Sequence, residues 1–428
     1  MSNKTIHRRT RSGLVAALDV GTTKVCCLIA RLGSERGVAP GDGLKIIGIG
    51  HQVSHGLRSG TVVDLDDTEA SIRATVEAAE QMAGENIRQV VVNLSGGEPA
   101  SRLIAYEISI AGHEIGDADL RRILDPSVLK NGLAKDRELV HTIPVGYSID
   151  GNRGVRDPRG MFGEKFGVNM HVISAKSGAV RNLETSVQRC HLDVEDMVVS
   201  PYASGLAALV DDEILLGVTC IDMGGGTTSF AVFFDGELVH TDSIPVGGVH
   251  VTNDIARGLS TPLKQAERMK TLYGSAMPSS SDDREVIKAP LVGEEKNAEA
   301  SHIPRSMLVG IIRPRIEEML EMVRDRLKAA GFDKVGGRRV VLTGGASQLP
   351  GARELAASII DKQVRMSRPK TIEGMAEVIS GPAFATSAGL LYYAISNKAE
   401  APSAAYCPPE QMNRGFGRLG QWMRENFY

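Results

Sequence analysis

The chain has 428 residues, of which 42% are hydrophobic and 24% charged, and its formal net charge is −3. This length is sufficient for two or more domains with substantial cores. The near-neutral charge excludes a global attraction to nucleic acid, so no nucleic-acid partner is expected, and no segment approaches the roughly 20 apolar residues of a transmembrane helix.

The first part of the chain predicts a sheet with one helix. Residues 1–12 form a basic arm that is expected to be disordered. Strands are then predicted at 13–20, 25–32, 44–54 and 89–94. A helix capped by Asp66 or Thr68 should precede the last of these strands and end near Met82.

Residues 98–168 interrupt this pattern. They contain two alternating runs, 101–110 and 139–149, and one short helical segment at 117–124. This composition predicts a small inserted α+β unit. The parent domain is expected to resume with a strand at 170–174 and a helix at 177–190.

The second half is predicted to start near Asp211. A long helical region should occupy residues 251–333, and an apolar helix at 382–396 should pack back on the interface between the halves. Residues 397–412 are a Pro/Ala/Ser linker whose composition predicts disorder.

One short loop occurs twice in the chain. Residues 18–24 read LDVGTTK and residues 221–228 read IDMGGGTT, each between two strand-like runs. The pattern predicts two hairpins in two like-built halves that face each other. Gly-rich turns bring backbone N–H groups close to phosphate oxygens, and threonine hydroxyls add donors. The expected phosphate-binding residues are Gly21, Thr22, Thr23, Gly224, Gly225, Gly226 and Thr227. Asp19 and Asp222 are expected to hold a magnesium ion through water, because magnesium prefers oxygen ligands and retains much of its hydration shell.

A third turn follows a buried strand at 340–343. There Gly344 and Gly345 leave bare backbone on which a base or ribose could lie, and Ser347 follows. In open α/β sheets ligands bind outside the carboxyl ends of strands. The turn therefore predicts the nucleoside end of an ATP site.

These three turns, in this order, resemble the superfamily of actin, Hsp70 and sugar kinases, and most closely the FtsA family of bacterial cell-division actins. The likeness covers residues 13–396 and the last sixteen residues. It implies an α/β, actin-like (ribonuclease H-like) two-domain ATPase fold with four subdomains. Their expected ranges are 13–97, 169–210 and 382–396 for 1A; 98–168 for 1C; 211–250 and 334–381 for 2A; and 251–333 for 2B.

The resemblance assigns further residues to the site. It brings Glu267 and Lys270 to the ribose and adenine; they share one helix face, and the alternative is a surface ion pair. Lys24 either offsets phosphate charge or faces solvent. The water-orienting position falls on Asp196, whose short, charged side chain implies at most a slow ATPase.

Residues 413–428 form an amphipathic tail. On a helix, one side would carry Phe416, Leu419, Trp422, Met423 and Phe427, with arginines on its borders. Bulky apolar residues flanked by arginine are typical of a helix in the membrane interface. The alternative is a tail that docks on the protein's own core.

The resemblance implies a division protein that polymerises and tethers the FtsZ ring to the cytoplasmic face of the bacterial inner membrane at the division site. Subdomain 2B would bind the C-terminal peptide of FtsZ, with Arg313 and Arg315 as candidate contacts, and 1C would recruit later division proteins. The alternatives are a sugar kinase, an Hsp70-like chaperone, and a PilM-like pilus-assembly ATPase.

Overall fold

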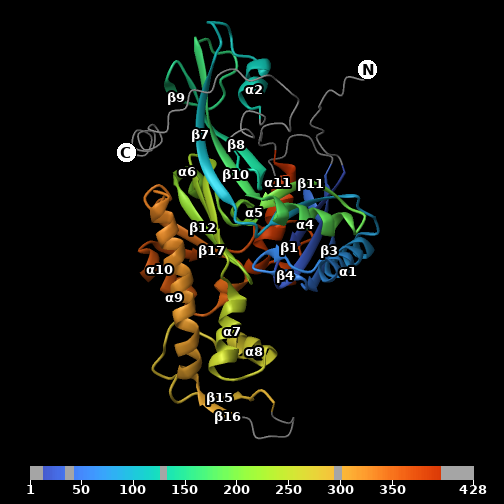
Figure 1. Ribbon diagram of the computed structural model, residues 1–428, viewed down its shortest axis with the longest axis vertical. Coiled ribbons are helices and arrows are strands. Elements are labelled where there is room, and N and C mark those ends of the chain that lie inside the picture. Colours follow the sequence, from blue (N-terminus) through green and yellow to red (C-terminus); the bar gives the residue numbers. More distant parts are fainter. Residues whose placement is uncertain (1–12, 34–42, 126–132, 294–300, 397–428) are drawn as a thin grey trace.

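The structure, a computed structural model, describes residues 13–33, 43–125, 133–293 and 301–396. Two five-stranded sheets form its centre, a four-stranded sheet projects from one end, and a helical region projects from the other (Figure 1). The predicted basic arm, linker and tail lie outside the described residues. Within those residues no helix is both long enough and apolar enough to cross a membrane.

The first central sheet has the strand order β11-β6-β1-β2-β3. Its strands are β1 (Leu14–Val20), β2 (Lys24–Leu32), β3 (Leu44–Val53), β6 (Gln89–Leu94) and β11 (Asp193–Val199). β2 is antiparallel to β1 and β3, whereas β6 runs parallel to β1 and to β11. The first predicted hairpin, β1–β2, is therefore confirmed.

The second central sheet repeats this arrangement in the order β14-β13-β12-β17-β18. Its strands are β12 (Val218–Met223), β13 (Thr228–Phe234), β14 (Glu237–Ile244), β17 (Arg339–Thr343) and β18 (Gln363–Met366). Again, β13 is antiparallel to β12 and β14, whereas β17 runs parallel to β12 and to β18. The two like-built halves predicted from the repeated loop are present.

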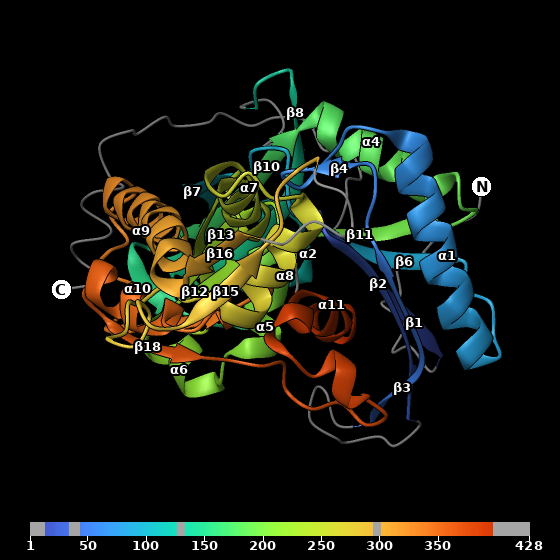
Figure 2. The same ribbon diagram turned by 90° about the horizontal axis from the view of Figure 1, so that it is seen from below.

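Two helices, α5 (Ser200–Ala208) and α11 (Ala385–Ile395), lie between the sheets (Figure 2). Apolar residues from both sheets are buried with them in one core. The helices cross at backbone distance, because a Cβ on Gly389 would lie 1.7 Å from the carbonyl oxygen of Ala203. The predicted helix at 382–396 thus does pack at the interface between the halves.

The outer face of each central sheet is covered by a different helix pair. These helices are α1 (Leu65–Ala83) and α4 (Ser177–Gln188) in the first half, and α9 (Arg305–Ala329) and α10 (Ala352–Ile360) in the second. α1 starts earlier than predicted: its cap is Asp64, whose Oδ1 accepts hydrogen bonds of 3.0 Å from the N–H groups of Asp66 and Asp67.

The projecting sheet is the predicted insertion. It consists of β7 (Ala100–Ser109), β8 (Arg137–Ile149), β9 (Asn152–Val155) and β10 (Lys165–Lys176), in the order β7-β10-β8-β9, with α2 (Asp117–Ile123) packed on it. The strand predicted at 170–174 is the second half of β10. It pairs with β7 and β8, so it belongs to the inserted sheet and not to the parent sheet.

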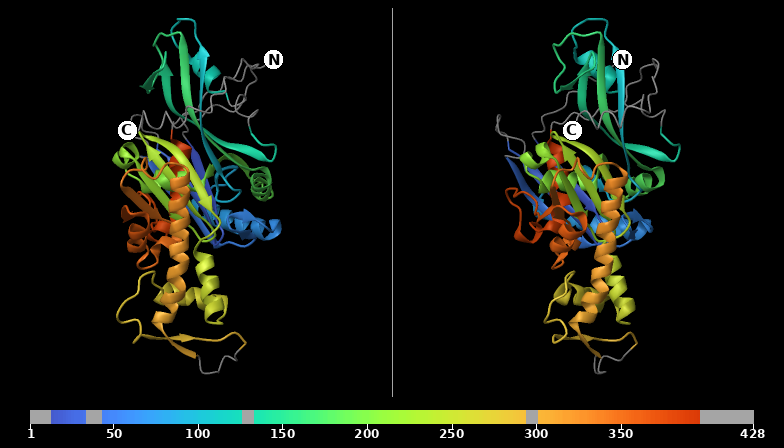
Figure 3. Two further views of the ribbon diagram at one scale, coloured as in Figure 1. Left: turned by 60° about the vertical axis from the view of Figure 1, so that its left-hand side comes forward. Right: turned by 90° about the vertical axis from the view of Figure 1, so that its left-hand side faces the viewer.

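The helical region at the opposite end follows the third strand of the second half (Figure 3). It contains α7 (Gly248–Gly258), α8 (Leu263–Tyr273), β15 (Val286–Ala289), β16 (Ser301–Pro304) and most of α9. In the first half the same position holds only the small hairpin of β4 (Leu57–Arg58) and β5 (Thr61–Val62) together with α1. The remaining short helices are α6 (Asp211–Leu216), η1 (Gly345–Gln348), η2 (Glu377–Ile379) and η3 (Pro382–Phe384).

Candidate functional site

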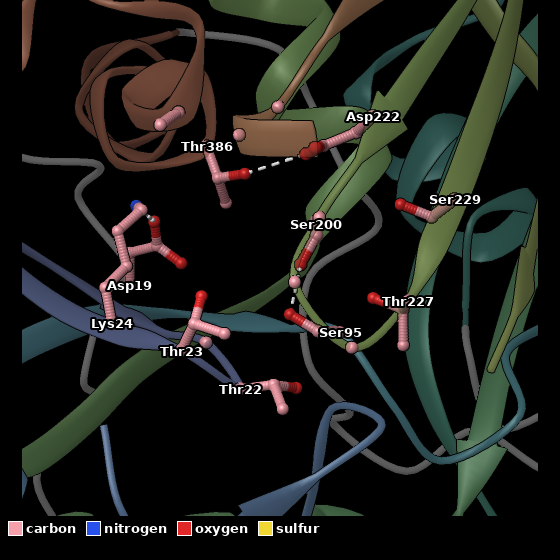
Figure 4. Close-up of a pocket in the computed structure, with 17 residues that line it drawn as sticks. Asp19, Thr22, Thr23, Lys24, Ser95, Ser200, Asp222, Thr227, Ser229 and Thr386 are labelled. Carbon is pink, nitrogen blue, oxygen red and sulfur yellow. Dashed lines mark hydrogen bonds and ion pairs between the residues drawn. The ribbon is translucent and has the colours of Figure 1, made fainter. Parts of the chain in front are cut away.

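Both repeated loops line one pocket between the halves (Figure 4). The predicted residues that line it are Asp19, Gly21, Thr22, Thr23, Lys24, Asp222, Gly224, Gly225, Gly226, Thr227, Gly344 and Gly345. Ser95, Ser200, Ser229, Ala383 and Thr386 line it as well and were not predicted. The cavity measures about 130 Å³, which is less than the 300–1,000 Å³ or so of pockets that enclose a drug-sized ligand.

The two loops form the same backbone turn. Gly21 N–H donates to the carbonyl of Lys24 at 3.0 Å, and Gly224 N–H donates to the carbonyl of Thr227 at 2.9 Å. In both loops the aspartate is the last residue but one of its strand, and the glycine that opens the turn directly follows the strand. The repeated sequence therefore encodes a repeated conformation.

The surfaces of the two loops are complementary. A Cβ on Gly226 would lie 2.2 Å from Thr22 Oγ1, and a Cβ on Gly225 would lie 2.6 Å from the side chain of Thr23. The threonines of the first loop thus occupy the room that the glycines of the second leave open. The two loops therefore touch at Gly225 and Gly226.

Each loop is supported from its own half. The carbonyls of Gly224 and Gly225 accept hydrogen bonds of 3.0 and 2.8 Å from the N–H groups of Gly248 and Val249, at the start of α7. In the first loop, Thr22 Oγ1 accepts a bond of 2.9 Å from Gly60 N–H in the β4–β5 hairpin. The second loop is therefore anchored on the helical region and the first on a short hairpin.

The carboxylates of Asp19 and Asp222 are buried behind the loops. Asp19 Oδ2 accepts from Lys24 Nζ at 3.1 Å and from Ser387 Oγ at 2.7 Å. Asp222 Oδ2 accepts from Ser204 Oγ at 2.5 Å and from Thr386 Oγ1 at 3.0 Å. None of these three hydroxyls was predicted from the sequence. For Thr386 and Ser387 the signal is a pair of hydroxyl residues at the start of the otherwise apolar segment ATSAGLL.

The electrostatics of the pocket couple these groups. Burial raises the pKa of the Asp222 carboxyl, and the hydroxyls of Ser204 and Thr386 partly offset that effect. Burial lowers the pKa of Lys24, but the Asp19 carboxylate, together with Cys26 and Asp222, outweighs burial, so the pKa is raised. Lys24 also lies 4.5 Å from the centre of the Phe384 ring. Lys24 therefore stays charged and compensates Asp19, rather than pointing into solvent.

The floor of the pocket is formed by two serines. Ser95 Oγ and Ser200 Oγ lie 2.8 Å apart, and Asn93 Nδ2 donates to both, at 3.0 and 3.1 Å. Asn93 Oδ1 accepts from Val20 N–H at 2.6 Å, which joins this floor to the first loop. These neutral groups are next to the predicted phosphate site.

Asp196 is not brought to the pocket. It lies exposed within β11, whereas the residue of this segment that lines the pocket is Ser200, the first residue of α5. The position was assigned by counting residues along the chain. Such a count does not show that β11 continues to Val199, or that its pairing with β6 is irregular near Val194. The position of Asp196 does not support the water-orienting role expected for it.

The third turn reaches the pocket with Gly344 and Gly345. Gly344 has φ 87° and ψ 162°, a conformation almost restricted to glycine. A Cβ there would lie 2.3 Å from Asp222 Oδ1. Ser347 does not line the pocket; it is buried and its hydroxyl donates to the carbonyl of Gly344 at 2.7 Å, so it stabilises the turn.

Glu267 and Lys270 do meet on α8. Lys270 Nζ donates to Glu267 Oε2 at 2.7 Å, to Thr252 Oγ1 at 2.9 Å and to the carbonyl of Gly248 at 3.1 Å. Neither residue lines the pocket as it stands. Lys270 thus contacts Gly248, whose N–H anchors the second loop. A Cβ on Gly248 would lie 3.2 Å from Ala346 Cβ, so this ion pair is close to the turn that holds Gly344 and Gly345.

The predicted partner residues lie on α9. Arg315 forms a two-pronged ion pair with Asp254 of α7, at 2.6 and 3.2 Å, and so ties two helices together. Arg313 pairs with Glu317 at 2.7 Å and is more exposed. The tail residues Phe416, Leu419, Trp422, Met423 and Phe427 lie outside the described residues.

Within the described residues, no group of three or more His, Cys, Asp or Glu side chains could hold a metal ion. The pocket carboxylates that could face a hydrated cation are those of Asp19 and Asp222.

Two family models match the chain. The model described as "Cell division protein FtsA" matches residues 219–389. The model described as "SHS2 domain inserted in FTSA" matches residues 96–174, which spans most of the inserted sheet.

Curated relatives match nearly the whole chain. "Cell division protein FtsA" of Rhizobium meliloti is 46% identical over 423 residues, covering 97% of this chain and 96% of the relative. The protein of the same name from Escherichia coli K12 is 30% identical over 432 residues, covering 98% and 100%. This likeness over nearly the whole chain favours the FtsA family over a sugar kinase, a chaperone or a pilus protein.

Solved structures share the fold. The "PilM-PilN type IV pilus biogenesis complex" matches with a TM-score of 0.63 at 17% identity, over 91% of this chain and 100% of that one. MreB5 of Spiroplasma citri bound to ADP matches with a TM-score of 0.52 at 14% identity, over 88% and 95%. At such identities the matches show the fold alone, and they confirm the predicted actin-like two-domain α/β architecture.

Proposed function

The chain belongs to the FtsA family of cell division proteins, and on that premise we propose that it binds ATP and magnesium between its two halves. In this proposal it polymerises and tethers the division ring to the membrane. The observation that carries the nucleotide site is the pair of identical turns, one from each half, that meet over two buried carboxylates. Two such turns can bind one polyphosphate from both sides.

The charged groups of the pocket suit a magnesium–phosphate complex. The carboxylates of Asp19 and Asp222 would accept hydrogen bonds from the water shell of the cation. Bound magnesium would neutralise phosphate charge. The N–H groups of Gly225 and Gly226 and the hydroxyls of Thr22, Thr23 and Thr227 would donate to phosphate oxygens. MreB5, which shares the fold, has been solved with ADP and with AMPPNP, which is in keeping with a nucleotide here.

Turnover is expected to be slow at most. Among the groups of the pocket that could orient an attacking water are the hydroxyls of Ser95 and Ser200. A hydroxyl pair held by an amide is a weak general base, since neither group carries a charge. The nucleotide would then act chiefly by holding the two halves in one arrangement.

The proposed partners follow from the family. The helical region would bind the C-terminal peptide of FtsZ, and its exposed apolar side chains at Leu272, Val286 and Met307 offer contact area. Arg313, which pairs with Glu317 of the same helix, is the more exposed of the two arginines, whereas Arg315 ties α9 to Asp254 of α7. The inserted sheet would recruit later division proteins, other copies of the chain would form the polymer, and residues 413–428 would bind the cytoplasmic face of the inner membrane.

The nucleotide site is tested by ATP binding with and without magnesium. Asp222→Ala should abolish magnesium-dependent binding, because the cation loses one of its two carboxylates. Asp212→Ala, which removes an exposed aspartate of α6, is the matched control. Unchanged affinity in Asp222→Ala would refute the proposed role of this carboxylate.

The membrane tether is tested by fluorescence. Trp422 is the only tryptophan of the chain, so its emission reports on the tail alone. Vesicles with anionic lipids should shift the emission to shorter wavelengths as the indole enters an apolar phase. An unshifted spectrum, together with equal flotation of a chain lacking 413–428, would contradict the tether.

A further inference from the structure

The two carboxylates of the pocket come from opposite halves of the molecule, yet adjacent residues hold them. Thr386 Oγ1 donates to Asp222, and Ser387 Oγ donates to Asp19. Both donors lie in the first turn of α11, and both are buried. One rigid helical turn therefore fixes both carboxylates relative to each other.

The arrangement is closed by a third hydroxyl. Ser204 Oγ, on α5, lies 2.5 Å from Asp222 Oδ2 and 2.8 Å from Thr386 Oγ1. α5 and α11 cross at backbone contact near Gly389, so the donors have little freedom to shift. Hydroxyl groups held by two packed helices give the carboxylates fixed orientations.

The pattern of acceptors is the same on both carboxylates. Among the described residues, every hydrogen bond to Asp19 or Asp222 goes to Oδ2, and none goes to Oδ1. A carboxylate has two oxygens and about four acceptor sites. Each aspartate thus retains one oxygen whose acceptor capacity the protein does not use. Two such oxygens, held by one helical turn, match a single hydrated cation shared by both halves.

We propose that Thr386 and Ser387 are positioning residues that orient Asp222 and Asp19 toward one shared magnesium ion. This inference rests on the proposed function. It makes α11 the element that sets the geometry of the cation site, although no residue of α11 would touch the ion itself. Thr386 and Ser387 act through hydrogen bonds to carboxylates, which are roughly twice as strong as those between neutral groups.

The test compares magnesium dependence with nucleotide affinity in the full chain. A fluorescent ATP analogue is titrated with excess Mg²⁺ and with EDTA, and the Mg²⁺ concentration for half-maximal binding is measured at fixed nucleotide. For Ser387→Ala and Thr386→Val this concentration should rise about 5- to 10-fold, as expected for one charged hydrogen bond each. Affinity in EDTA should change less than 2-fold. Thr386→Ser keeps the hydroxyl and should restore the wild-type value.

The matched control is Ser186→Ala. Ser186 is a buried helical serine whose hydroxyl donates to the carbonyl of Asn182 within α4, away from the pocket. A purely structural role of Thr386 or Ser387 would lower affinity equally with Mg²⁺ and with EDTA, or lower the melting temperature alone, and either result overturns the inference. Wild-type half-saturation in both variants overturns it too. A wild-type chain that binds no ATP would instead contradict the proposed function.

Discussion

The two halves share one strand order, but they use the end of the fourth strand differently. In the second half, β17 leads into Gly344 and Gly345, which line the pocket. In the first half, β6 leads through Ser95 into Gly96, and a Cβ on Gly96 would lie 2.5 Å from the carbonyl oxygen of Gly60 in the β4–β5 hairpin. In the first half, the β4–β5 hairpin that follows the third strand thus covers the turn after β6. In the second half, the turn after β17 stays open to the pocket. The two halves thus place two similar loops at the pocket, but only one of the two fourth strands leads into a glycine turn that is open there.

Gly344→Ala should have the largest effect on this difference, because it alters the turn that is open in the second half alone. Alanine is strained at φ 87° and its Cβ would meet Asp222 Oδ1, so the expected loss is about 3 kcal/mol of stability or more, together with loss of ATP binding. Gly345→Ala is the control, because its Cβ would meet only Ala383 Cβ, at 3.7 Å. Urea unfolding and nucleotide titration measure both. Equal behaviour of the two variants would contradict the special role of Gly344.

Acidification should lower the free energy of unfolding through two buried histidines, which lie where the inserted sheet contacts β14 of the second half. His171 on β10 is bonded to Ser101, whose oxygen also accepts from Thr241 N–H of β14, and His240 of β14 stacks on Phe332 at 4.6 Å. Burial lowers the pKa of His171 to about 3 and that of His240 to about 4.

Both histidines are neutral in the fold, whereas in the unfolded chain they take up protons below about pH 6.5. Stability therefore falls as the pH drops from about 6.5 toward the folded pKa values, by roughly 1.4 kcal/mol per histidine at pH 5.5. Urea unfolding at pH 7 and 5.5 measures this loss. His240→Phe keeps the ring stack and should halve the loss, while His191→Gln, at an exposed site, should leave it unchanged. A loss that His240→Phe leaves intact would refute this assignment.

The complementarity of the two loops is tested by Gly226→Ala. The new Cβ would collide with Thr22, so the nucleotide-free form should lose about 2 kcal/mol. Thr22→Ala should remove the collision and recover part of that stability, and a double-mutant cycle measures the coupling. Strict additivity of the two substitutions would show that the loops do not touch in solution.

The smallest effect is expected from Thr22→Val. It removes the acceptor for Gly60 N–H and should cost about 1 kcal/mol. Thermal unfolding measures the cost, and Ser59→Ala, which removes the longer 3.3 Å bond from the hairpin to the carbonyl of Pro245, should cost less. The reverse ranking would place the main support of the first loop elsewhere.

Much of the fold could be predicted because the strands are apolar runs with clear Gly-rich turns between them. The hairpins, the inserted sheet and the helix at 382–396 were found this way. Among the residues that line the pocket, those of the repeated loops, such as Asp19 and Asp222, could be predicted from the sequence. The hydroxyls of Ser204, Thr386 and Ser387 could not, because the contact depends on how α5 and α11 cross and not on any spacing along the chain. Asp196 was misplaced for a related reason: counting residues does not show where β11 ends and α5 begins.

The contact between the loops has a consequence for affinity. In the proposed function a nucleotide would compete with Thr22 and Thr23 for the space between the halves, so it would bind molecules whose loops have separated. If one molecule in a hundred is separated, the measured Kd is about a hundredfold weaker than that of the separated form. Any partner that prefers separated halves would then strengthen nucleotide binding from a distance, and nucleotide would strengthen the partner's binding by the same factor.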